Sequence, residues 1–594
     1  MTSLPIFLRP RVDSVEVDLT QRIKLILSTT AAVNGEFERG PIDKPHFNNG
    51  PLENFLAKYG EKANPQKYGF AHDTVTSFRR ASSNTLINRV VGAGALHAGL
   101  SVIKETNRLI GLPVIAGSAG GYTAEDLHDI ILLKFAGDLI TANSFTMSVT
   151  DGITVVPTTP VVFATSHNNT MNNIAAAIQA AMNTGFSATD GSATVYSELS
   201  GNNRIILIRP PRNLSLSFFG AAVTLGATQT AASIVTDAKL VDLLAENPGD
   251  WGNDYGYKFT NFDPGTRQRV RLTFSQALVA LNEFNISING TPITPVTYAT
   301  SSDATMAAIA AAIQASPDVV SATVESVAGS ISNDRSILVV AQVPGPDKIA
   351  LTGALVTLGA SQAIVVTTEV LKGVEPDHTF TIEIFNRSNV TKPVERFKVS
   401  FREQTDSLGF PQNIDYVVNK SSKRSINIRA AQTAVTKVSG FSLFDATGAL
   451  PTVPTNVLFF TGGDDGVAVT SADVRAGWNK MADRTYYPTN LLLNAGYSSI
   501  AVMQTMVELA RARSDCLAIL DCPFDKLLAE DYRRFRLEEM NIDDSNGAIY
   551  GPYVEIEDEK TGARRLIPPS GAIGAVYADN DKLTKQLGSP FGLN

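Results

Sequence analysis

The chain has 594 residues, a mass of 63.4 kDa and a formal net charge of −8. At about 150 residues per domain, this length predicts roughly four domains. The acidic balance argues against a nucleic-acid-binding protein, which needs a basic face to displace counterions from phosphates. Charged residues make up 18% of the chain and hydrophobic residues 44%, a composition that excludes disordered, collagen-like and coiled-coil chains.

The N-terminal residues MTSLPIFLRPRVDSVEV place Arg9 and Arg11 inside an apolar stretch, so we expect no signal peptide. No apolar run approaches the roughly 18 residues that a membrane helix needs, and we therefore expect no membrane insertion. The two cysteines, Cys516 and Cys522, flank the apolar run LAIL with more spacing than a zinc-binding pair. We interpret both as buried thiols beside a core strand.

Comparison of the sequence with itself reveals a module that occurs twice. Segment 133–145 aligns with 272–284, and the ATS…AAAIQA pattern of 164–180 recurs at 299–315. Further along, ATVYS at 193–197 matches ATVES at 322–326, and VTLGA occurs at both 223–227 and 356–360. The order of the matches is the same in both copies, so we interpret them as two versions of one module.

Each copy is predicted to be a small α+β module. A helix is indicated by apolar residues at helical spacing, and its free N–H groups can be capped by the preceding Ser, Asn and Thr residues, or by Asp303 and Thr305 in copy 2. Residues 204–209 predict a further strand that ends at Pro210 and Pro211. The alternating strand positions are Phe145, Met147 and Val149 and their counterparts Phe284, Ile286 and Ile288, and the helical positions are Ile174, Ala177, Ile178, Ala181 and Met182.

The segments around the modules predict a host domain with α/β character. Residues 490–493 and 516–520 are expected to form parallel strands joined by a helix that begins near Ser499. Strand 379–385 can pair with 255–259, which would place copy 2 inside a hairpin of the host. The expected N-terminal elements are a strand at 23–27, a turn at 37–41 and helices near 52–59 and 74–80.

The predicted fold class is therefore α/β (α+β) and multidomain, with one host core and two small modules. Residues 1–24 are expected to form an extended N-terminal arm, because the segment is short and interrupted by prolines. The modules occupy 113–236 and 266–370, and the host core occupies 25–112, 237–265 and 371–594.

Motifs that carry chemistry are weak in this sequence. There is no GxxxxGK[ST] loop, no HExxH pair among the six histidines and no GxSxG motif. The glycine-rich segment 92–99 lacks the GxGxxG spacing, and Asp464 and Asp465 alone would make a poor metal cage. We interpret both segments as structural turns. The sequence predicts no catalytic, cofactor-binding or metal-binding residues and no enzymatic activity.

Six short motifs, taken in order, resemble those of the tail sheath proteins of contractile bacteriophages. They are GEFERGP at 35–41, LINRV at 86–90, NPGDWGN at 247–253, FTGGDDG at 460–466, AILDCP at 518–523 and IPPSGAIGAVYADND at 567–581. In the last motif, Gly574 and Ala575 stand where the family has Ala-Gly. The motif residues expected to be structural are Gly40, Pro41, Pro248, Gly249, Trp251, Gly252, Asn253, Gly462, Gly463, Asp465, Gly466, Asp521, Pro523, Pro568, Pro569, Ser570, Gly571, Tyr577 and Asp581.

The resemblance implies a sheath core decorated by two inserted, mutually homologous modules. Copies would form a helical cylinder around the inner tail tube, and the cylinder would contract to drive the tube through the host cell envelope. The implied partners are other copies of the chain, the tail tube protein, and baseplate and tail terminator proteins. The implied location is the virion, after assembly in the host cytoplasm, with no cofactor, no direct contact with nucleic acid and no ATP site.

In that family an N-terminal arm pairs with strands of an adjacent subunit, and a further C-terminal domain follows the stretch that resembles 589–594. The resemblance therefore implies an arm in this chain and a domain beyond residue 594 in the complete protein. The expected arm residues are Leu4, Ile6, Leu8, Val12, Val15 and Val17.

A different class of protein also fits part of the sequence. A surface-exposed fibre or adhesin with tandem β-rich modules would suit the low charge and the Thr- and Ser-rich repeats. Such proteins are exported, and no export signal is expected here. An enzyme with an unrecognised site is the third alternative.

Overall fold

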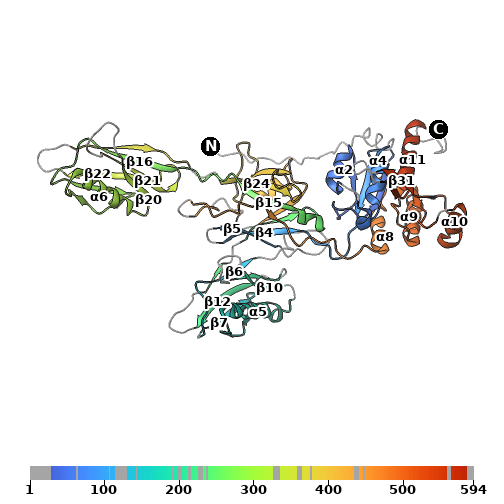
Figure 1. Ribbon diagram of the computed structural model, residues 1–594, viewed down its shortest axis with the longest axis horizontal. Coiled ribbons are helices and arrows are strands. Elements are labelled where there is room, and N and C mark those ends of the chain that lie inside the picture. Colours follow the sequence, from blue (N-terminus) through green and yellow to red (C-terminus); the bar gives the residue numbers. More distant parts are fainter. Residues whose placement is uncertain are drawn as a thin grey trace, which may run out of the picture.

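The structure is a computed structural model with mixed α/β architecture and several separate sheets (Figure 1). It describes residues 29–61, 64–105, 108–113, 130–141, 143–188, 191–196, 204–211, 214, 216–224, 232–235, 239–325, 335–357, 364–374, 378–433, 436, 441–445, 449–526, 528–557 and 564–584. The predicted arm and the strand expected at 23–27 lie outside these residues. Among the described residues, none of the helices has both the length and the apolar character needed to cross a bilayer.

The first and last parts of the chain form one α/β domain around a six-stranded sheet, ordered β2-β3-β1-β28-β29-β30. All neighbouring pairs are parallel except β2 with β3. The expected parallel strands on either side of a helix are confirmed as β28, α9 and β29. The bounds are β1 (Ala31–Gly35), β2 (His46–Asn48), β3 (Thr85–Arg89), β28 (Leu491–Leu493), α9 (Ile500–Arg513), β29 (Leu517–Asp521) and β30 (Gly547–Tyr550).

Helices cover both faces of this sheet, because successive residues of the buried strands point to opposite sides. Leu492 and Leu520 pack against α8 and α9, whereas Leu491, Leu493 and Ile519 pack against α2, α4 and α11. The bounds are α2 (Leu52–Tyr59), α3 (Pro65–Tyr68), α4 (Ala71–Arg79), α8 (Ser471–Asn479), α10 (Ala529–Arg534), the π-helix η3 (Phe535–Met540), β31 (Val554–Glu557), β32 (Arg564–Ile567) and α11 (Ser570–Thr584).

The middle of the molecule is a β domain of two four-stranded sheets, ordered β26-β14-β4-β5 and β25-β24-β15-β27. The predicted pairing of 379–385 with 255–259 is confirmed by the antiparallel register of β15 with β24. Phe259, Phe380 and Phe401 pack ring against ring in its core. The bounds are β4 (Gly99–Glu105), β5 (Arg108–Pro113), β14 (Lys239–Ala245), η2 (Asp250–Asp254), β15 (Tyr255–Thr260), β24 (Thr379–Asn386), β25 (Glu395–Ser400), α7 (Ile414–Asn419), β26 (Ile428–Gln432) and β27 (Leu458–Phe459).

Two smaller lobes, which we call module 1 and module 2, have the same order of elements and equivalent sheets, each with its own core. Module 1 consists of β6 (Ile131–Phe135), β7 (Ser144–Thr150), β8 (Val155–Pro157), β9 (Val161–Val162), α5 (His167–Gly185), β10 (Ser192–Tyr196), β11 (Ile205–Arg209), β12 (Ser217–Thr224) and β13 (Ala232–Val235). Module 2 consists of β16 (Arg267–Phe274), β17 (Glu283–Ile288), β18 (Thr291–Pro292), β19 (Val296–Thr297), α6 (Ser302–Gln314), β20 (Val319–Glu325), β21 (Ser336–Pro344), β22 (Leu351–Thr357) and β23 (Val366–Leu371).

The local predictions for the modules hold except in two details. The alternating burial of β7 and β17 is confirmed, but in α5 Ala175 is buried and Ala177 only half-buried. The capping prediction for copy 2 is wrong, because Ser301 is the N-cap of α6 and its hydroxyl accepts a hydrogen bond from the Ala304 N–H at 3.1 Å. Asp303 and Thr305 lie inside the helix, where the Thr305 hydroxyl donates back to the Ser301 carbonyl.

The modules are attached to the β domain in different ways (Figure 1). In module 1, residues of β6 and β11 form a shared apolar cluster with β4 and β5, in which Leu132 and Leu207 lie against Ile103 and Leu112. The core cluster of module 2 contains only residues of module 2 itself. Figure 1 shows module 2 as a lobe at one end of the molecule, connected to the β domain by extended chain.

Candidate functional site: the junction of the two central domains

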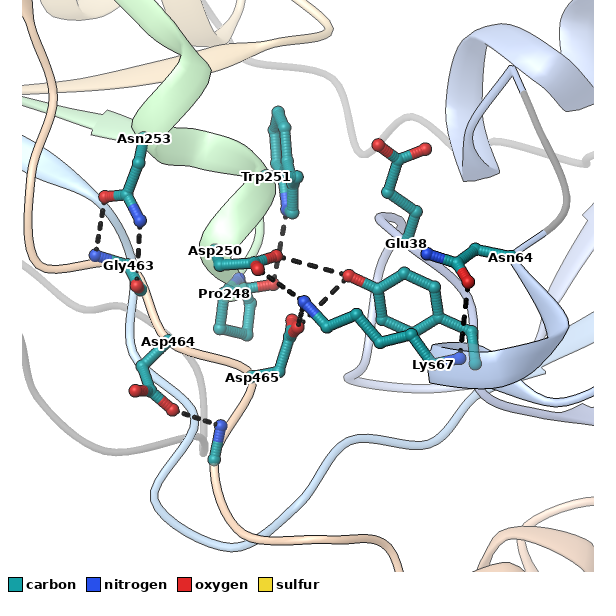
Figure 2. A network of polar contacts seen from close by, with 12 residues as sticks. Glu38, Asn64, Lys67, Pro248, Asp250, Trp251, Asn253, Gly463, Asp464 and Asp465 are labelled. Atoms are coloured by element: carbon teal, nitrogen blue, oxygen red, sulfur yellow. Dashed lines mark hydrogen bonds and ion pairs between the residues drawn. The ribbon is translucent and has the colours of Figure 1, made fainter.

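Four of the six motifs meet where the α/β domain joins the β domain. Figure 2 shows this junction, to which residues near 38, 67, 250 and 465 contribute. Gly40 belongs to the loop after β1, Trp251 to η2 and Asp465 to the loop after β27. The segments are far apart in sequence, so their convergence is a property of the tertiary fold.

Arg89, the last residue of β3, is the buried centre of the junction. Its guanidinium donates hydrogen bonds to the carbonyls of Phe37, Glu38, Gly40 and Pro248 at 2.8 to 3.1 Å. Burial lowers the pKa of Arg89 to about 10, so the group stays protonated at neutral pH. A guanidinium offers five donors in a fixed fork, and this one ties the loop after β1 to the start of η2.

A network of charged side chains occupies the same junction (Figure 2), and its Asp465 lies 3.9 Å from the Arg89 guanidinium. Lys67 of α3 forms ion pairs with Asp250 and, at 2.6 Å, with Asp465. The Tyr68 hydroxyl lies 3.2 Å from Asp250 and 3.1 Å from Asp465. Partial burial lowers the pKa of Lys67, but the bonds to the two carboxylates outweigh it and raise the pKa overall. The network joins α3 of the α/β domain to η2 and to the loop after β27.

Glycines at the junction permit close contact of backbone with backbone. A Cβ at Gly252 would lie 2.6 Å from the Ala245 Cβ, and one at Gly463 would lie 2.5 Å from the Gly249 carbonyl oxygen. Asn253 and the Gly463 backbone exchange two hydrogen bonds of 2.9 and 3.0 Å. Trp251 is buried, and its indole N–H donates to the Pro248 carbonyl. Larger residues at these two glycines would force the loops apart.

The glycine-rich segment 92–99 packs against the same loop, as expected of a structural turn. Leu96 and Asp464 form an isolated antiparallel β-bridge, and the Val467 N–H donates a hydrogen bond to the Ala93 carbonyl. Gly466 has a φ of +80°, a conformation that favours glycine. Gly462 has the same φ value, and Pro41 is half-buried beside Gly40.

The two C-terminal motifs form a second cluster, in which α11 docks on the sheet. Asp521 is the last residue of β29. Its carboxylate accepts hydrogen bonds from the Ser570 N–H and hydroxyl, both at 2.7 Å, and from the Gly496 N–H at 2.8 Å. Complete burial raises the pKa of Asp521 to about 6, and the hydrogen bonds oppose this rise. Gly571 allows α11 to approach α4, since a Cβ there would lie 2.6 Å from the Thr74 carbonyl oxygen.

The remaining residues of these motifs support the same docking. The Tyr577 hydroxyl lies 2.9 Å from that of Tyr550 on β30, and Asp581 accepts a hydrogen bond from Thr29. The prolines shape the turns before the helices: Pro523 and Pro569 carbonyls accept from Lys526 and Ile573, and Pro568 is buried near Gly496.

The junction borders an open pocket of about 190 Å³, lined in part by Glu36, Tyr68, Arg89 and Asp465. Burial raises the pKa of Glu36. Among the charged groups that line it, Lys67 and Asp465 are paired with each other, and the Glu36 carboxylate lies 3.5 Å from the Tyr497 hydroxyl. Within the described ranges, no group of three or more His, Cys, Asp or Glu side chains is arranged to hold a metal ion.

The predicted cysteine positions are largely as expected. Cys522 is buried and Cys516 is half-buried, and both are free thiols. Burial raises the pKa of Cys516 to about 12 and that of Cys522 to about 11, so neither carries a reactive thiolate at neutral pH.

Sequence reasoning did not select Lys67, Tyr68 and Arg89 as site residues. Arg89 stood within the motif at 86–90, but nothing in its neighbours marks it as buried. Lys67 and Tyr68 carry no sequence signal, because their partners are about 180 and 400 residues away. The predicted arm residues, Leu4 to Val17, lie outside the described residues.

Comparison with protein-family models finds none that matches the chain. The comparison with curated proteins finds no match either.

Proposed function

We propose that this chain is a structural subunit of a contractile tail sheath, which polymerises as a helical cylinder around an inner tube and contracts to drive the tube through a cell envelope. The observation that carries the proposal is the ordered set of six sheath-like motifs. Its support from the fold is that four motifs meet at one junction and two at the docking site of α11.

The character of these contacts fits a mechanical role. A sheath subunit must keep its shape while its contacts with neighbours change between two packings. Arg89, with four backbone carbonyl acceptors, and the Lys67 ion pairs hold the two central domains in one arrangement. The stored energy in such a machine lies in the lattice of subunits, so the proposal requires no enzymatic activity, cofactor or nucleotide site.

In this proposal the α/β and β domains are the sheath core at 25–112, 237–265 and 371–594, and the modules are homologous insertions at 113–236 and 266–370. Equivalent sheet orders and equivalent N-cap serines, Ser166 and Ser301, support the homology. Modules that project from the core would decorate the outer surface of the cylinder. Residues 1–24 would be the arm that links neighbouring subunits.

The proposal is tested by expressing the chain and examining it by negative-stain electron microscopy. A sheath subunit should form striated hollow tubes, alone or with the tail tube protein. Thin fibres would favour the alternative, a surface fibre or adhesin with tandem β-rich modules. Particles that remain single under both conditions would argue against the sheath proposal.

Deletion of residues 1–20 tests the role of the arm. The shortened chain should fold, because none of the described elements includes these residues, and it should form no tubes, because the arm that would link neighbouring subunits is gone. Circular dichroism checks the fold and sedimentation velocity checks the state of assembly. Tubes formed by the shortened chain would discard the role of the arm while leaving the sheath proposal in place.

A further inference from the structure

The outer strand of module 2 has an unpaired edge. In the sheet β20-β21-β16-β23, β23 pairs with β16 on one side, and no strand among the described residues pairs with its other side. Five of its six residues are exposed. Large apolar side chains stand out from the strand and its flanks: Val365, Val370, Leu371 and Val374 are each 46 to 59% exposed.

The devices that usually protect an edge strand are weak here. Such edges are blunted by short length, prolines, charged side chains or bulges. β23 runs for six residues in continuous register with β16 and contains no proline or lysine, and its one charged residue, Glu369, is paired with Arg271 of β16. The equivalent edge of module 1, β13, has four residues, of which Ala232 and Ile234 pack against the core of that module. An open edge of this kind is a template for a further strand.

The sequence of β23 suits pairing with itself. In an antiparallel pair of identical strands, facing residues must be an even number of positions apart, because backbone groups alternate in direction along a strand. One such register centres on Thr368, which then faces the same residue of the second copy. Val366 faces Val370, Thr367 faces Glu369 and Val365 faces Leu371, so apolar and β-branched side chains oppose one another.

One of the two neighbouring symmetric registers, the one centred on Glu369, is disfavoured by charge. Centring the pair on Glu369 would place two carboxylates directly opposite each other, which is destabilising in a sheet. In the Thr368-centred register each Glu369 faces a threonine and keeps its 2.9 Å ion pair with Arg271 of its own module. Charge therefore excludes the Glu369-centred register, and the Thr368-centred register is favoured over the Thr367-centred one because it places Val366 opposite Val370 and Val365 opposite Leu371.

We propose that module 2 is a self-association surface, in which β23 of one chain pairs antiparallel with β23 of a second copy, centred on Thr368. The contact joins two four-stranded sheets into one continuous sheet. Module 2 stands apart from the other lobes (Figure 1), and five of the six residues of β23 are exposed, so another copy can reach the strand. The contact has two-fold symmetry, which neighbours in a one-directional helical cylinder do not share, so it would join free subunits or separate cylinders, and its failure would not bear on the sheath proposal.

The register is tested by cysteine cross-linking of the full chain. Directly opposed residues lie about 5 Å apart, within disulfide reach, so Thr368→Cys should form a disulfide-linked dimer under mild oxidation. Thr367→Cys is the matched control, because its counterpart lies two residues further along, beyond the roughly 7 Å limit for a disulfide. At least fivefold faster dimer formation for Thr368→Cys supports the register, and equal rates would overturn it.

The strength of the contact is tested by placing like charges at its centre. Thr368→Lys opposes two ammonium groups and should weaken association of the full chain at least tenfold in sedimentation velocity. Thr154→Lys makes the same change at an exposed position of module 1 and should leave association unchanged. Equal behaviour of the two variants, or a wild-type chain that stays monomeric at about 100 µM, would contradict the proposal.

Discussion

Modules 1 and 2 have the same architecture but opposite relations to the rest of the molecule. The register of β6 with β11 and of β16 with β21 makes their outward-facing positions comparable. In module 1 these positions include Leu132 and Leu207, which are buried against the β domain. The equivalents in module 2 are Arg271 and Leu338, which are only partly covered. The same fold therefore presents a buried apolar face in module 1 and a partly exposed face, which includes a charged residue, in module 2.

The charged groups follow the same division. Beside module 1, the Lys239 ammonium and the Asp242 carboxylate form a 2.9 Å ion pair with both side chains less than 10% exposed. Ser101 also donates a hydrogen bond to Asp242. On module 2, Arg271 pairs with Glu325 and Glu369 across the open face of the sheet. The residues on the outward face of one sheet therefore determine whether a module docks on the β domain, and the residues of the module core do not.

The largest expected effect comes from Leu207→Asp, which breaks the docked face of module 1. The substitution removes buried apolar surface and places a carboxylate among Ile103, Leu112 and Leu132, at a cost of about 4 kcal/mol. Hydrogen exchange of the β4, β5 and β11 amides should accelerate strongly. The matched control is Leu338→Asp at the equivalent position of module 2, where little change is expected. Similar acceleration in both variants would mean that the two faces do not differ.

A smaller effect is expected from Asp242→Asn beside module 1. It leaves the buried Lys239 ammonium without its carboxylate, which costs about 3 kcal/mol. Glu369→Gln on module 2 makes the matching change in a solvent-exposed ion pair, and we expect no measurable loss. Chemical denaturation of both variants checks the difference, and a larger loss for Glu369→Gln would reverse the comparison.

The pH dependence of the stability of the α/β domain provides a reference, because it should not depend on either module. The pKa of Asp521 is raised from its usual value of 3.8 to about 6, so folding favours the protonated carboxyl. Its stabilising contribution is complete below about pH 4 and is lost as the pH rises to about 6, a change of up to about 3 kcal/mol.

Denaturation of the wild type and of Asp521→Asn between pH 4 and pH 7, followed by the fluorescence of the two buried tryptophans, Trp251 and Trp478, measures this dependence. The variant should lack it, while exchange of the module amides stays unchanged. A variant with the same pH dependence as the wild type would assign the titration to another group.

The smallest expected effect is that of Lys67→Met at the junction of the central domains. Lys67 is 41% exposed, so loss of its ion pairs with Asp250 and Asp465 should cost about 1 kcal/mol or less. Arg89→Met serves as the buried counterpart and should cost several times more, because it leaves four carbonyls without their donor. Thermal denaturation of the two variants measures the ratio, and a larger loss for Lys67→Met would contradict the assignment of Arg89 as the centre.

The sequence predicted much of the local structure, because periodic burial is visible in a single chain. The alternation in β7 and β17, the helix after Ser499 and the pairing of β15 with β24 all follow from apolar patterning. It did not predict the docking of module 1, since Leu132 and Leu207 lie in strands that are apolar on both faces. Such a strand does not reveal which partner covers its second face.

The candidate site was predictable only as isolated motifs. Glycines and prolines marked the turns at 35–41, 247–253 and 460–466, because tight turns need special backbone conformations. Their meeting around Arg89 depends on contacts across the whole chain, which local patterning does not encode. Lys67 and Tyr68 were missed for the same reason, as was the ion pair between Lys239 and Asp242.

The most direct test of the sheath account is the location of this chain on native particles. Antibodies against module 2, with its exposed outer strand, should label tailed particles along the whole shaft at a regular axial spacing. After triggering, the labelled region should become shorter and wider. Labelling confined to fibres, capsid or baseplate, or a labelled shaft that keeps its length when the tube is ejected, would contradict the account.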